Sequence, residues 1–315
     1  MSTATLTAPV LLVNDLLTGA EWGAAQTREL LAMAADVKAH PERYAKTLRG
    51  KTLAMIFEKP SLRTRVTFEV GIQSMGGSVV FLDQTQARLG ERESIADVAR
   101  NLERWVQGIV ARVYEQRVLE EMAANANIPV INALSDRFHP CQALADFLTL
   151  QEKFGDLRGL KLAYVGDGNN VCHSLIFLAG RLGVSLRVAT PADYKPEPEV
   201  LADTKRVARE TKAKIELFTD PREAVAGAQG VYTDSWTSMG FEAQQKVRDA
   251  VFAPYQVNRE LMALAAPDAV FMHCLPAHRG HEVTAEILDG PQSVVLDQSE
   301  NRMYAQKAIL QALYS

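Results

Sequence analysis

The segment from Phe57 to Arg65 carries residue types that could bind a phosphate group. It reads Phe-Glu-Lys-Pro-Ser-Leu-Arg-Thr-Arg and follows an apolar run, 53–57, that predicts a buried strand. Pro60 ends that run, and Ser61 is a good N-cap for a helix predicted over 61–75. A phosphate at this helix start would meet unpaired backbone N–H groups and the positive end of the helix dipole.

Two hydroxyls and a guanidinium complete this candidate anion site. Arg63 and Arg65 are two positions apart, so on a helix they point in nearly opposite directions. We expect Arg63 to share a face with Ser61 and Thr64, and Arg65 to serve the structure. A capped helix with solvated arginines explains this segment equally well, so other segments must decide.

Arginine, histidine and glutamine follow the next predicted strands. Arg112 closes a buried run that begins at Ile109, although a lone arginine there would usually be a surface charge. His139 and Gln142 lie in His-Pro-Cys-Gln at the start of a helix predicted over 141–153, where both could face a ligand. A histidine in such a place is more often structural than catalytic.

The glycine-rich segment 166–171 follows another predicted strand and opens a helix. Its sequence, Gly-Asp-Gly-Asn-Asn-Val, is close to a dinucleotide fingerprint, but Val171 stands in place of the third glycine. We therefore rank NAD binding below a small-ligand site that uses Asn169 or Asn170.

A carboxylate follows the predicted strand at 230–233. Asp234 begins the sequence Asp-Ser-Trp-Thr-Ser-Met-Gly. Its side chain could bind the α-amino group of an amino acid ligand, while backbone N–H groups bind the α-carboxylate of that ligand. A well-capped turn is a plausible structural explanation of the same residues.

The segment His273–Glu282 looks at first like a metal site, because it holds three histidines and a cysteine. His273 and Cys274 are adjacent, however, and no second cluster of cysteine or histidine completes a tetrahedral set. A thiol near a polar small-molecule site fits better than zinc, and we expect no metal.

Composition limits the class of protein. The 315 residues carry a net charge of -4, which gives no reason to expect nucleic acid or an anionic membrane as a partner. No apolar stretch approaches the ~20 residues that span a bilayer. The first twenty residues contain no Lys or Arg, so we predict no secretory signal. Three widely spaced cysteines favour a reducing cytoplasm over a disulfide framework.

Short apolar runs alternate with amphipathic segments along the chain, which predicts an α/β fold with parallel sheets covered by helices on both faces. The expected strands are 53–57, 78–82, 109–113, 128–132, 161–165, 185–189, 214–218, 230–233, 269–272 and 293–296. We predict two doubly wound domains, 1–153 and 154–315. The last helix, about 300–313, is expected to cross back to the first domain.

Taken together, these motifs resemble the carbamoyltransferase family, and within it the branch that uses ornithine. The match covers essentially the whole chain in one order: Ser61-Leu62-Arg63-Thr64-Arg65, Ala111-Arg112-Val113-Tyr114, His139-Pro140-Cys141-Gln142, Asp167-Gly168-Asn169-Asn170, Asp234-Ser235-Trp236-Thr237-Ser238-Met239-Gly240 and His273-Cys274-Leu275-Pro276. Ordered agreement of this kind is very improbable by chance.

The resemblance implies a role for individual residues. It assigns the phosphate to Ser61, the backbone N–H of Leu62, Arg63, Thr64 and Arg112. It surrounds the carbamoyl group with His139, Gln142, Cys274, Leu275 and Arg302, and it gives ornithine to Asn170, Asp234, Ser238 and Met239. Arg63, Arg112, His139 and Cys274 are the expected catalytic residues.

The implied reaction transfers the carbamoyl group of carbamoyl phosphate to the δ-amino group of L-ornithine, giving L-citrulline and phosphate without a cofactor. A homotrimer, or a multiple of trimers, is implied as well. Two residues depart from the family pattern: Leu62 replaces a common Thr, and Arg88 replaces Gln or His in the 83–92 loop. That loop, by resemblance, reaches toward a neighbouring subunit's site, and we assign it no role.

Several alternatives stay open at this point. The nearest is a sister carbamoyltransferase that acts on putrescine, an N-acylated ornithine or aspartate. A non-catalytic relative would be expected to have lost Arg63, His139 or Cys274, all of which are present. An NAD-dependent dehydrogenase is disfavoured by Val171.

Overall fold

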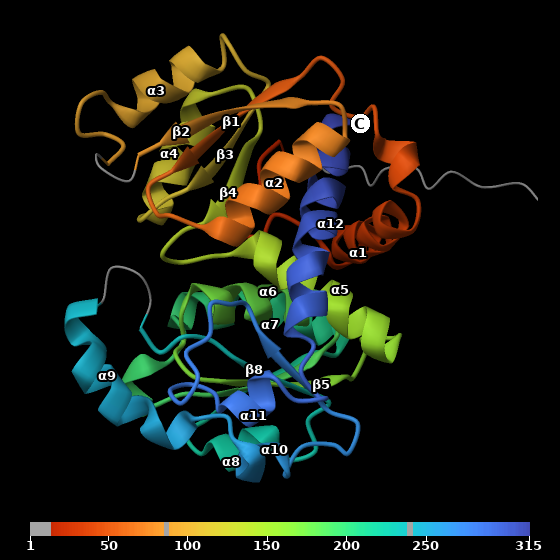
Figure 1. Cartoon of the computed structure of the whole chain (residues 1–315), viewed down its shortest axis with the longest axis vertical. Helices are drawn as coiled ribbons and strands as arrows, with labels where there is room; N and C mark the ends of the chain where they lie inside the picture. The colour runs from red at the N-terminus through yellow and green to blue at the C-terminus, as the bar shows by residue number, and fades with distance from the viewer. Residues whose placement is uncertain (1–13, 85–87, 238–241) are drawn as a thin grey trace, which may run out of the picture. The chain divides into compact units, whose positions relative to one another are not determined.

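The computed structural model describes residues 14–84, 88–237 and 242–315. The chain divides into two compact units. Unit 1 comprises the residues up to Leu144 together with Arg302–Ser315, and unit 2 comprises Ala145–Asn301. Each unit contains one parallel sheet with helices packed on it (Figure 1), which confirms the predicted fold class. The predicted domain limit at 153 lies near the end of helix α5, Pro140–Phe154, and stays a prediction.

The sheet of unit 1 has the strand order β2-β1-β3-β4. Its strands are β1 Thr52–Phe57, β2 Ser78–Asp83, β3 Gly108–Arg112 and β4 Val130–Leu134. From β1 the chain first adds β2 on one side and then returns to add β3 on the other side. The carboxyl ends of β1 and β3 therefore form a switch point, where doubly wound sheets bind ligands.

Helices cover both faces of this sheet. They are α1 Ala24–Ala39, α2 Leu62–Ser74, α3 Ile95–Leu102, α4 Gln116–Asn125, the start of α5, and the end of α12, which runs over Val295–Tyr314; a short 3-10 helix, η1, covers Pro41–Tyr44. The inward-facing Ala54 and Ile56 of β1 pack with apolar residues of α3 and α4. Figure 1 shows α12 beside α2, and a Cβ added at Gly71 of α2 would lie only 3.4 Å from Lys307 of α12.

The last helix begins earlier than expected and then packs within unit 1. Its part from Arg302 onward belongs to that unit, where Gln311 accepts a 2.5 Å hydrogen bond from the Thr47 hydroxyl. The strand predicted over 293–296 was wrong. Ser293 makes only an isolated bridge to Phe271, and helix α12 begins at Val295. The apolar run does not form a strand because part of it is the exposed first turn of a helix, with Leu296 75% exposed.

The sheet of unit 2 has the strand order β7-β6-β5-β8-β9. Its strands are β5 Lys161–Val165, β6 Ser185–Ala189, β7 Lys214–Phe218, β8 Gly230–Thr233 and β9 Val270–His273. The chain adds β6 and β7 on one side of β5 and then adds β8 on the other side, so a second switch point lies between β5 and β8.

The helices of unit 2 also lie on both sides of its sheet. Figure 1 shows α6 and α7 on one side and α8, α10 and α11 on the other. The helices are α6 Asn170–Leu182, α7 Pro198–Thr211, α8 Pro221–Val225, α9 Gln245–Phe252, α10 Arg259–Met262 and α11 Ala285–Leu288, with 3-10 helices η2 Ala192–Tyr194, η3 Glu242–Gln244 and η4 Ala253–Tyr255. Helices α9, α10 and α11 were not predicted, because short helices carry too little periodicity to be recognised.

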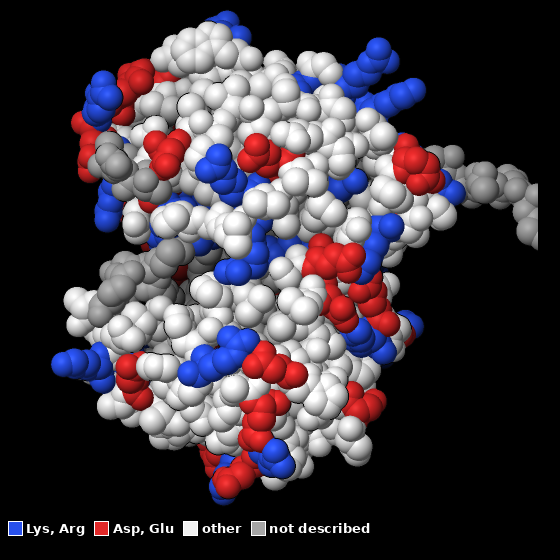
Figure 2. All heavy atoms as spheres, in the orientation of Figure 1, with Lys and Arg blue, Asp and Glu red and all other residues white. Residues whose placement is uncertain are grey.

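Two general features of the chain are the distribution of its charged side chains and the hydropathy of its helices. Over the face of each unit that Figure 2 shows, basic and acidic side chains are interspersed. Among the described residues, the helices include none that is long and apolar enough to cross a membrane.

The contact between α6 and α7 gives a prediction about stability. A Cβ added at Gly180 of α6 would lie 2.3 Å from Cγ2 of Thr204 on α7. We expect Gly180→Ala to lower the free energy of unfolding by about 1–3 kcal/mol, the usual cost of overpacking, measured by urea denaturation.

The second change that tests this clash is Thr204→Ser, which removes Cγ2 and keeps the hydroxyl that donates to the Val200 carbonyl at 2.8 Å. Adding Thr204→Ser to Gly180→Ala should recover most of the loss, with Thr204→Ser alone as the control. Additive losses would show that the clash is not the cause.

Candidate functional site

Helix α2 begins at the carboxyl end of β1, as the cap signal predicted. The Ser61 hydroxyl accepts a hydrogen bond from the Thr64 N–H at 3.3 Å, and Ser61 itself has extended backbone. Leu62 is 74% exposed and Arg63 is half-buried. The first N–H groups of α2, with the positive end of its dipole, thus lie at the switch point of unit 1.

The two arginines of α2 have different surroundings. The guanidinium carbon of Arg65 lies 3.8 Å from the ring centroid of Phe81, and its Nε lies 3.6 Å from Glu69. These are contacts of a structural side chain. Arg63 lies two positions before Arg65 on the same helix, so helix geometry directs its side chain to a different face.

Arg112 occupies the end of β3, on the other side of the switch point. It is 5% exposed and is paired in register with Phe57 of β1. Its carbonyl accepts a hydrogen bond from the Glu58 N–H at 2.9 Å. Lys59, which follows Glu58 in the chain, is buried as well. Burial, and then the charge of Arg112, lowers the pKa of Lys59 to about 8.

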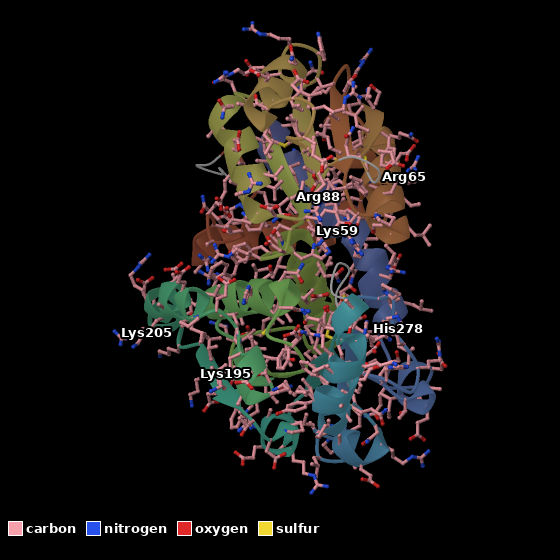
Figure 3. The ribbon with its side chains drawn as sticks, turned by 90° about the vertical axis from the view of Figure 1, so that its left-hand side faces the viewer. Lys59, Arg65, Arg88, Lys195, Lys205 and His278 are labelled. Carbon is pink, nitrogen blue, oxygen red and sulfur yellow. The ribbon has the colours of Figure 1, made fainter. Side chains whose placement is uncertain are left out.

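Arg88 lies within the same unit, against the ring of Tyr114. The guanidinium carbon of Arg88 and Nζ of Lys59 lie 4.4 and 4.5 Å from that ring centroid, and Figure 3 labels both cations. The buried carboxylate of Glu58 accepts hydrogen bonds from the N–H groups of Leu89 and Tyr114, each at 2.8 Å. The Glu58 carboxylate therefore forms hydrogen bonds to both the loop after β2 and the residues that follow β3.

A buried polar cluster forms where α5 begins. His139, Gln142 and Arg302 are all almost completely buried, and Nη2 of Arg302 donates to the Thr64 hydroxyl at 2.6 Å. Burial, and then the positive charges of Arg302 and Arg112, hold the pKa of His139 well below its ordinary value. The imidazole is therefore neutral at physiological pH and can donate a hydrogen bond without adding a buried charge.

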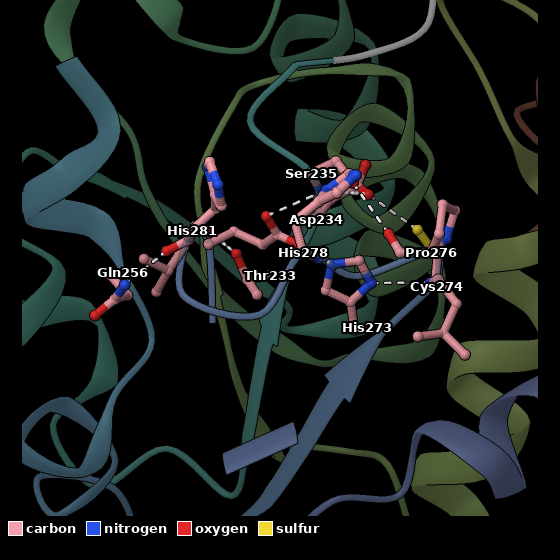
Figure 4. Close-up of polar contacts among 12 residues, drawn as sticks. Thr233, Asp234, Ser235, Gln256, His273, Cys274, Pro276, His278 and His281 are labelled. Carbon is pink, nitrogen blue, oxygen red and sulfur yellow. Dashed lines mark hydrogen bonds and ion pairs between the residues drawn. The ribbon is translucent and has the colours of Figure 1, made fainter. Parts of the chain in front are cut away.

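Asp234 is the centre of the candidate site in unit 2, at the end of β8 (Figure 4). One carboxylate oxygen lies 3.0 Å from the Cys274 thiol and accepts from the Ser235 N–H at 2.8 Å. The other accepts from Nδ2 of Asn169 at 2.8 Å. Three loops, after β5, β8 and β9, thus meet at one carboxylate, as parallel strands require.

Asn169 is the N-cap of α6. Its Oδ1 accepts from the N–H groups of Val171 and Cys172, at 3.0 and 3.1 Å. Asn170, the predicted ligand, is the first helical residue and is half-buried. Ser238 and Met239, also predicted ligands, lie outside the described residues.

The glycine-rich loop after β5 has a structural explanation that does not involve a dinucleotide. A Cβ added at Gly168 would lie 2.2 Å from the backbone nitrogen of Pro196 and 2.6 Å from the Tyr194 carbonyl oxygen. Gly168 is therefore needed because another segment of the chain packs against it.

The possibility of a metal site can be tested on the residues themselves. Asp234, His273 and Cys274 each offer a donor atom, and these atoms lie within 4.8 Å of one another. Nδ1 of His273, however, accepts from the Leu275 N–H at 2.9 Å, and its Nε2 lies 3.3 Å from the buried Glu282. All three side chains are thus engaged with protein groups, an arrangement that fits a polar site better than a metal centre. Sequence reasoning overlooked Asp234 as a third donor, because it lies far away in the chain.

Asp167 adds a second carboxylate near Asp234. It pairs with Arg248 of α9, and both side chains are mostly buried. Burial raises the pKa of Asp167 to about 6, against the opposing charge of Arg248.

Sequence reasoning missed Lys59 and Arg248. Lys59 is the second residue after a buried strand, and that position was a usable signal. Arg248 gave no signal, because it lies in a short helix that the periodicity did not reveal.

Two family models match the chain over almost all of its length. The carbamoyl-P binding domain of aspartate/ornithine carbamoyltransferase matches residues 14–152, and the Asp/Orn binding domain matches residues 158–313. The chain belongs to the aspartate/ornithine carbamoyltransferase family. The resemblance that the motifs indicated is confirmed.

Individual relatives of this carbamoyltransferase family agree closely. Ornithine carbamoyltransferase from Methanothermobacter thermautotrophicus is 54% identical over 282 residues, which cover 90% of this chain and 93% of that protein. The enzyme of that name from Thermus thermophilus is 51% identical over 304 residues, covering 96% and 97%. The solved structure of ornithine carbamoyltransferase from Pyrococcus furiosus superposes with a TM-score of 0.92 at 48% identity, covering 95% of this chain and 96% of that one.

Because His139 is buried as a neutral imidazole, it should make the free energy of unfolding of this carbamoyltransferase depend on pH. In the unfolded chain a histidine takes up a proton near pH 6.5, whereas the folded chain keeps His139 neutral to a lower pH. Protonation of His139 therefore favours the unfolded state, and the contribution of His139 to stability is lost as the pH falls below about 6.5. His139 alone contributes a slope of up to about 1.4 kcal/mol per pH unit.

Urea unfolding at several pH values between about 7 and 5 measures this slope. His139→Gln should make this slope shallower, whereas His40→Gln, which changes a partly exposed histidine of the same unit, should keep it. Equal slopes in wild type and His139→Gln would contradict the buried neutral imidazole.

Proposed function

We propose that this chain transfers the carbamoyl group of carbamoyl phosphate to the δ-amino group of L-ornithine, giving L-citrulline and phosphate. The observation that carries the proposal is that about half of the residues are identical to those of proteins named ornithine carbamoyltransferase, over nine-tenths or more of both lengths. The geometry of the two half-sites supports it. The alternatives that use putrescine, N-acylated ornithine or aspartate are not favoured.

Unit 1 would bind carbamoyl phosphate. The phosphate would lie at the N-terminus of α2, held by Ser61, the backbone N–H of Leu62, Arg63, Thr64 and Arg112. Because phosphate is the leaving group, these donors would stabilise the negative charge that grows on it in the transition state. The buried cationic surroundings of Arg112 support this assignment.

The carbamoyl group would contact His139, Gln142 and Arg302. Its carbonyl oxygen becomes more negative as the amine attacks, and donors placed in advance stabilise that charge. A neutral His139 can donate to this oxygen. The family resemblance also assigns Cys274 and Leu275 to the carbamoyl group.

Unit 2 would bind ornithine through Asn170, Asp234, Ser238 and Met239. The Asp234 carboxylate is the proposed partner of an amino group. The attacking δ-amine must be neutral, although a free amine of this type has a pKa of about 10.4. The contact between Asp234 and the Cys274 thiol supports a site that orients an amine. We expect no metal or cofactor to take part, since the chemistry needs only two substrates held in place.

We further propose a biosynthetic role, a cytoplasmic location and assembly into a homotrimer or a multiple of trimers. Related proteins from Pyrococcus furiosus and Campylobacter jejuni carry the word anabolic in their names. None of the three cysteines forms a disulfide, which suits a reducing compartment. Exposed apolar side chains on α2 and the edge strand β2 would be covered in an oligomer; they are Leu62, Val66, Val70 and Val80.

The proposed activity can be tested with a panel of amines in the presence of carbamoyl phosphate, with the ureido product measured. L-Ornithine should exceed putrescine, aspartate and N-acetylornithine in kcat/KM by at least about 100-fold, because the site is expected to pair both α-substituents. Faster carbamoylation of any other amine in the panel would overturn the proposal.

The phosphate assignment gives a second prediction. Arg63→Ala should abolish detectable turnover and keep the fold, because Arg63 serves the ligand and not the core. Arg65→Ala is the matched control, two positions along the same helix, and should keep most of the activity because Arg65 packs on Phe81. Steady-state kinetics and circular dichroism measure both effects. Near-normal turnover in Arg63→Ala would contradict the assignment.

A further inference from the structure

Arg248 is a buried cation of α9 that the proposed reaction does not use. Its Nη2 donates to the carboxylate of Asp167, and its Nε donates to the carbonyl of Trp236 at 2.5 Å. Asp167 follows β5, whereas Trp236 follows β8. A single guanidinium therefore joins the two loops that border the switch point of unit 2.

Aromatic rings enclose this guanidinium. Its carbon lies 4.8 Å from the ring centroid of Tyr194 and 5.2 Å from that of Phe252. The ring of Trp236 stacks on Phe252 with centroids 6.1 Å apart. Water has little access to the ion pair, since the Arg248 side chain is only 8% exposed. The planar fork of arginine can reach two acceptors in fixed directions, which a lysine ammonium cannot match.

One connection runs from Arg248 through Asp167 to Asp234. The carbonyl of Asp167 accepts hydrogen bonds from the Asn169 N–H and the Tyr164 hydroxyl, each at 2.8 Å. The side chain of Asn169 in turn donates to Asp234 at 2.8 Å. The position of Asp167 thus determines where Asn169 meets Asp234.

A second connection runs along the backbone. Trp236 follows Asp234 closely in the chain, and the Ser235 N–H between them donates to the Asp234 carboxylate at 2.8 Å. Holding the Trp236 carbonyl therefore restricts the backbone that carries Asp234. Arg248 acts on this carboxylate from two sides.

We propose that Arg248 is a positioning residue for the acceptor amino acid, because it holds Asp234 and Asn169 in their arrangement by bridging Asp167 and the Trp236 carbonyl. This inference rests on the proposed function. An Asp234 that is no longer held in place binds ornithine more weakly, while unit 1 binds carbamoyl phosphate as before.

Kinetics of Arg248→Lys and Arg248→Met test the proposal. Arg248→Lys keeps the charge but loses the fork, so it should raise the KM for ornithine by about tenfold or more, the size expected for a lost hydrogen bond to a charged group. The KM for carbamoyl phosphate should stay within about twofold. The control is Arg259→Lys, which changes an exposed arginine paired with Glu286 in the same unit, and it should leave both constants unchanged.

A binding measurement separates positioning from catalysis. L-Norvaline is ornithine without its δ-amino group, so it cannot react. Its Kd, measured by calorimetry with saturating carbamoyl phosphate, should rise in Arg248→Lys by the same factor as the KM for ornithine. Because Asp167 lies on the same connection, Asp167→Asn should also weaken norvaline binding, and the double variant should lose less than the product of the two single effects.

Three outcomes would overturn the inference. One is a lowered Tm in Arg248→Lys with an unchanged KM for ornithine and Kd for norvaline, which marks a purely structural residue. Another is a double variant whose loss of norvaline binding equals the product of the losses in Arg248→Lys and Asp167→Asn. The third is an equal rise in the KM for carbamoyl phosphate. If Arg248→Met does not fold, Arg248→Lys alone decides. A wild-type chain that fails to carbamoylate ornithine would instead refute the proposed function.

Discussion

Both candidate half-sites depend on one constraint of parallel sheets, namely that all strands end at the same edge. In each unit the chain adds strands on one side of its first strand and then returns to add strands on the other side. The loops after the two adjacent strands leave in opposite directions and open a space between them. In unit 1 the switch point is where α2 begins and β3 ends at Arg112, and in unit 2 it is where Asp167 and Asp234 follow β5 and β8.

Burial then gives the two spaces opposite electrostatic character. In unit 1, Arg112 and Arg302 lie close to His139 and keep its imidazole neutral, so the cluster is rich in donors and suited to an anion. In unit 2, two mostly buried carboxylates, Asp167 and Asp234, lie close enough to affect each other, and Arg248 offsets one of them. These local charges support the proposed division between carbamoyl phosphate, bound by unit 1, and an amino acid, bound by unit 2. The net charge of -4 could not have revealed it.

Much of the fold could be predicted from local pattern. Apolar runs such as 161–165 and 230–233 coincide with the observed strands, and Ser61 caps its helix as expected, because these signals act between near neighbours. The strand predicted at 293–296 failed where an apolar run opens a helix. Helix α9 was not predicted, and neither was Arg248 within it. The role of Arg248 depends on its contacts with Asp167 and Trp236, two residues that lie far from it in the sequence.

The sequence by itself determined the family, the type of fold and the order of the polar motifs, because residue types and spacings are local properties of the chain. The roles of individual side chains in the reaction stay predictions. Only the tertiary structure decided that Cys274 and Asn169 both contact the carboxylate of Asp234, and that Arg88 packs on Tyr114. It also decided which groups change their protonation, since burial and neighbouring charges shift a pKa and neither can be read from a linear sequence.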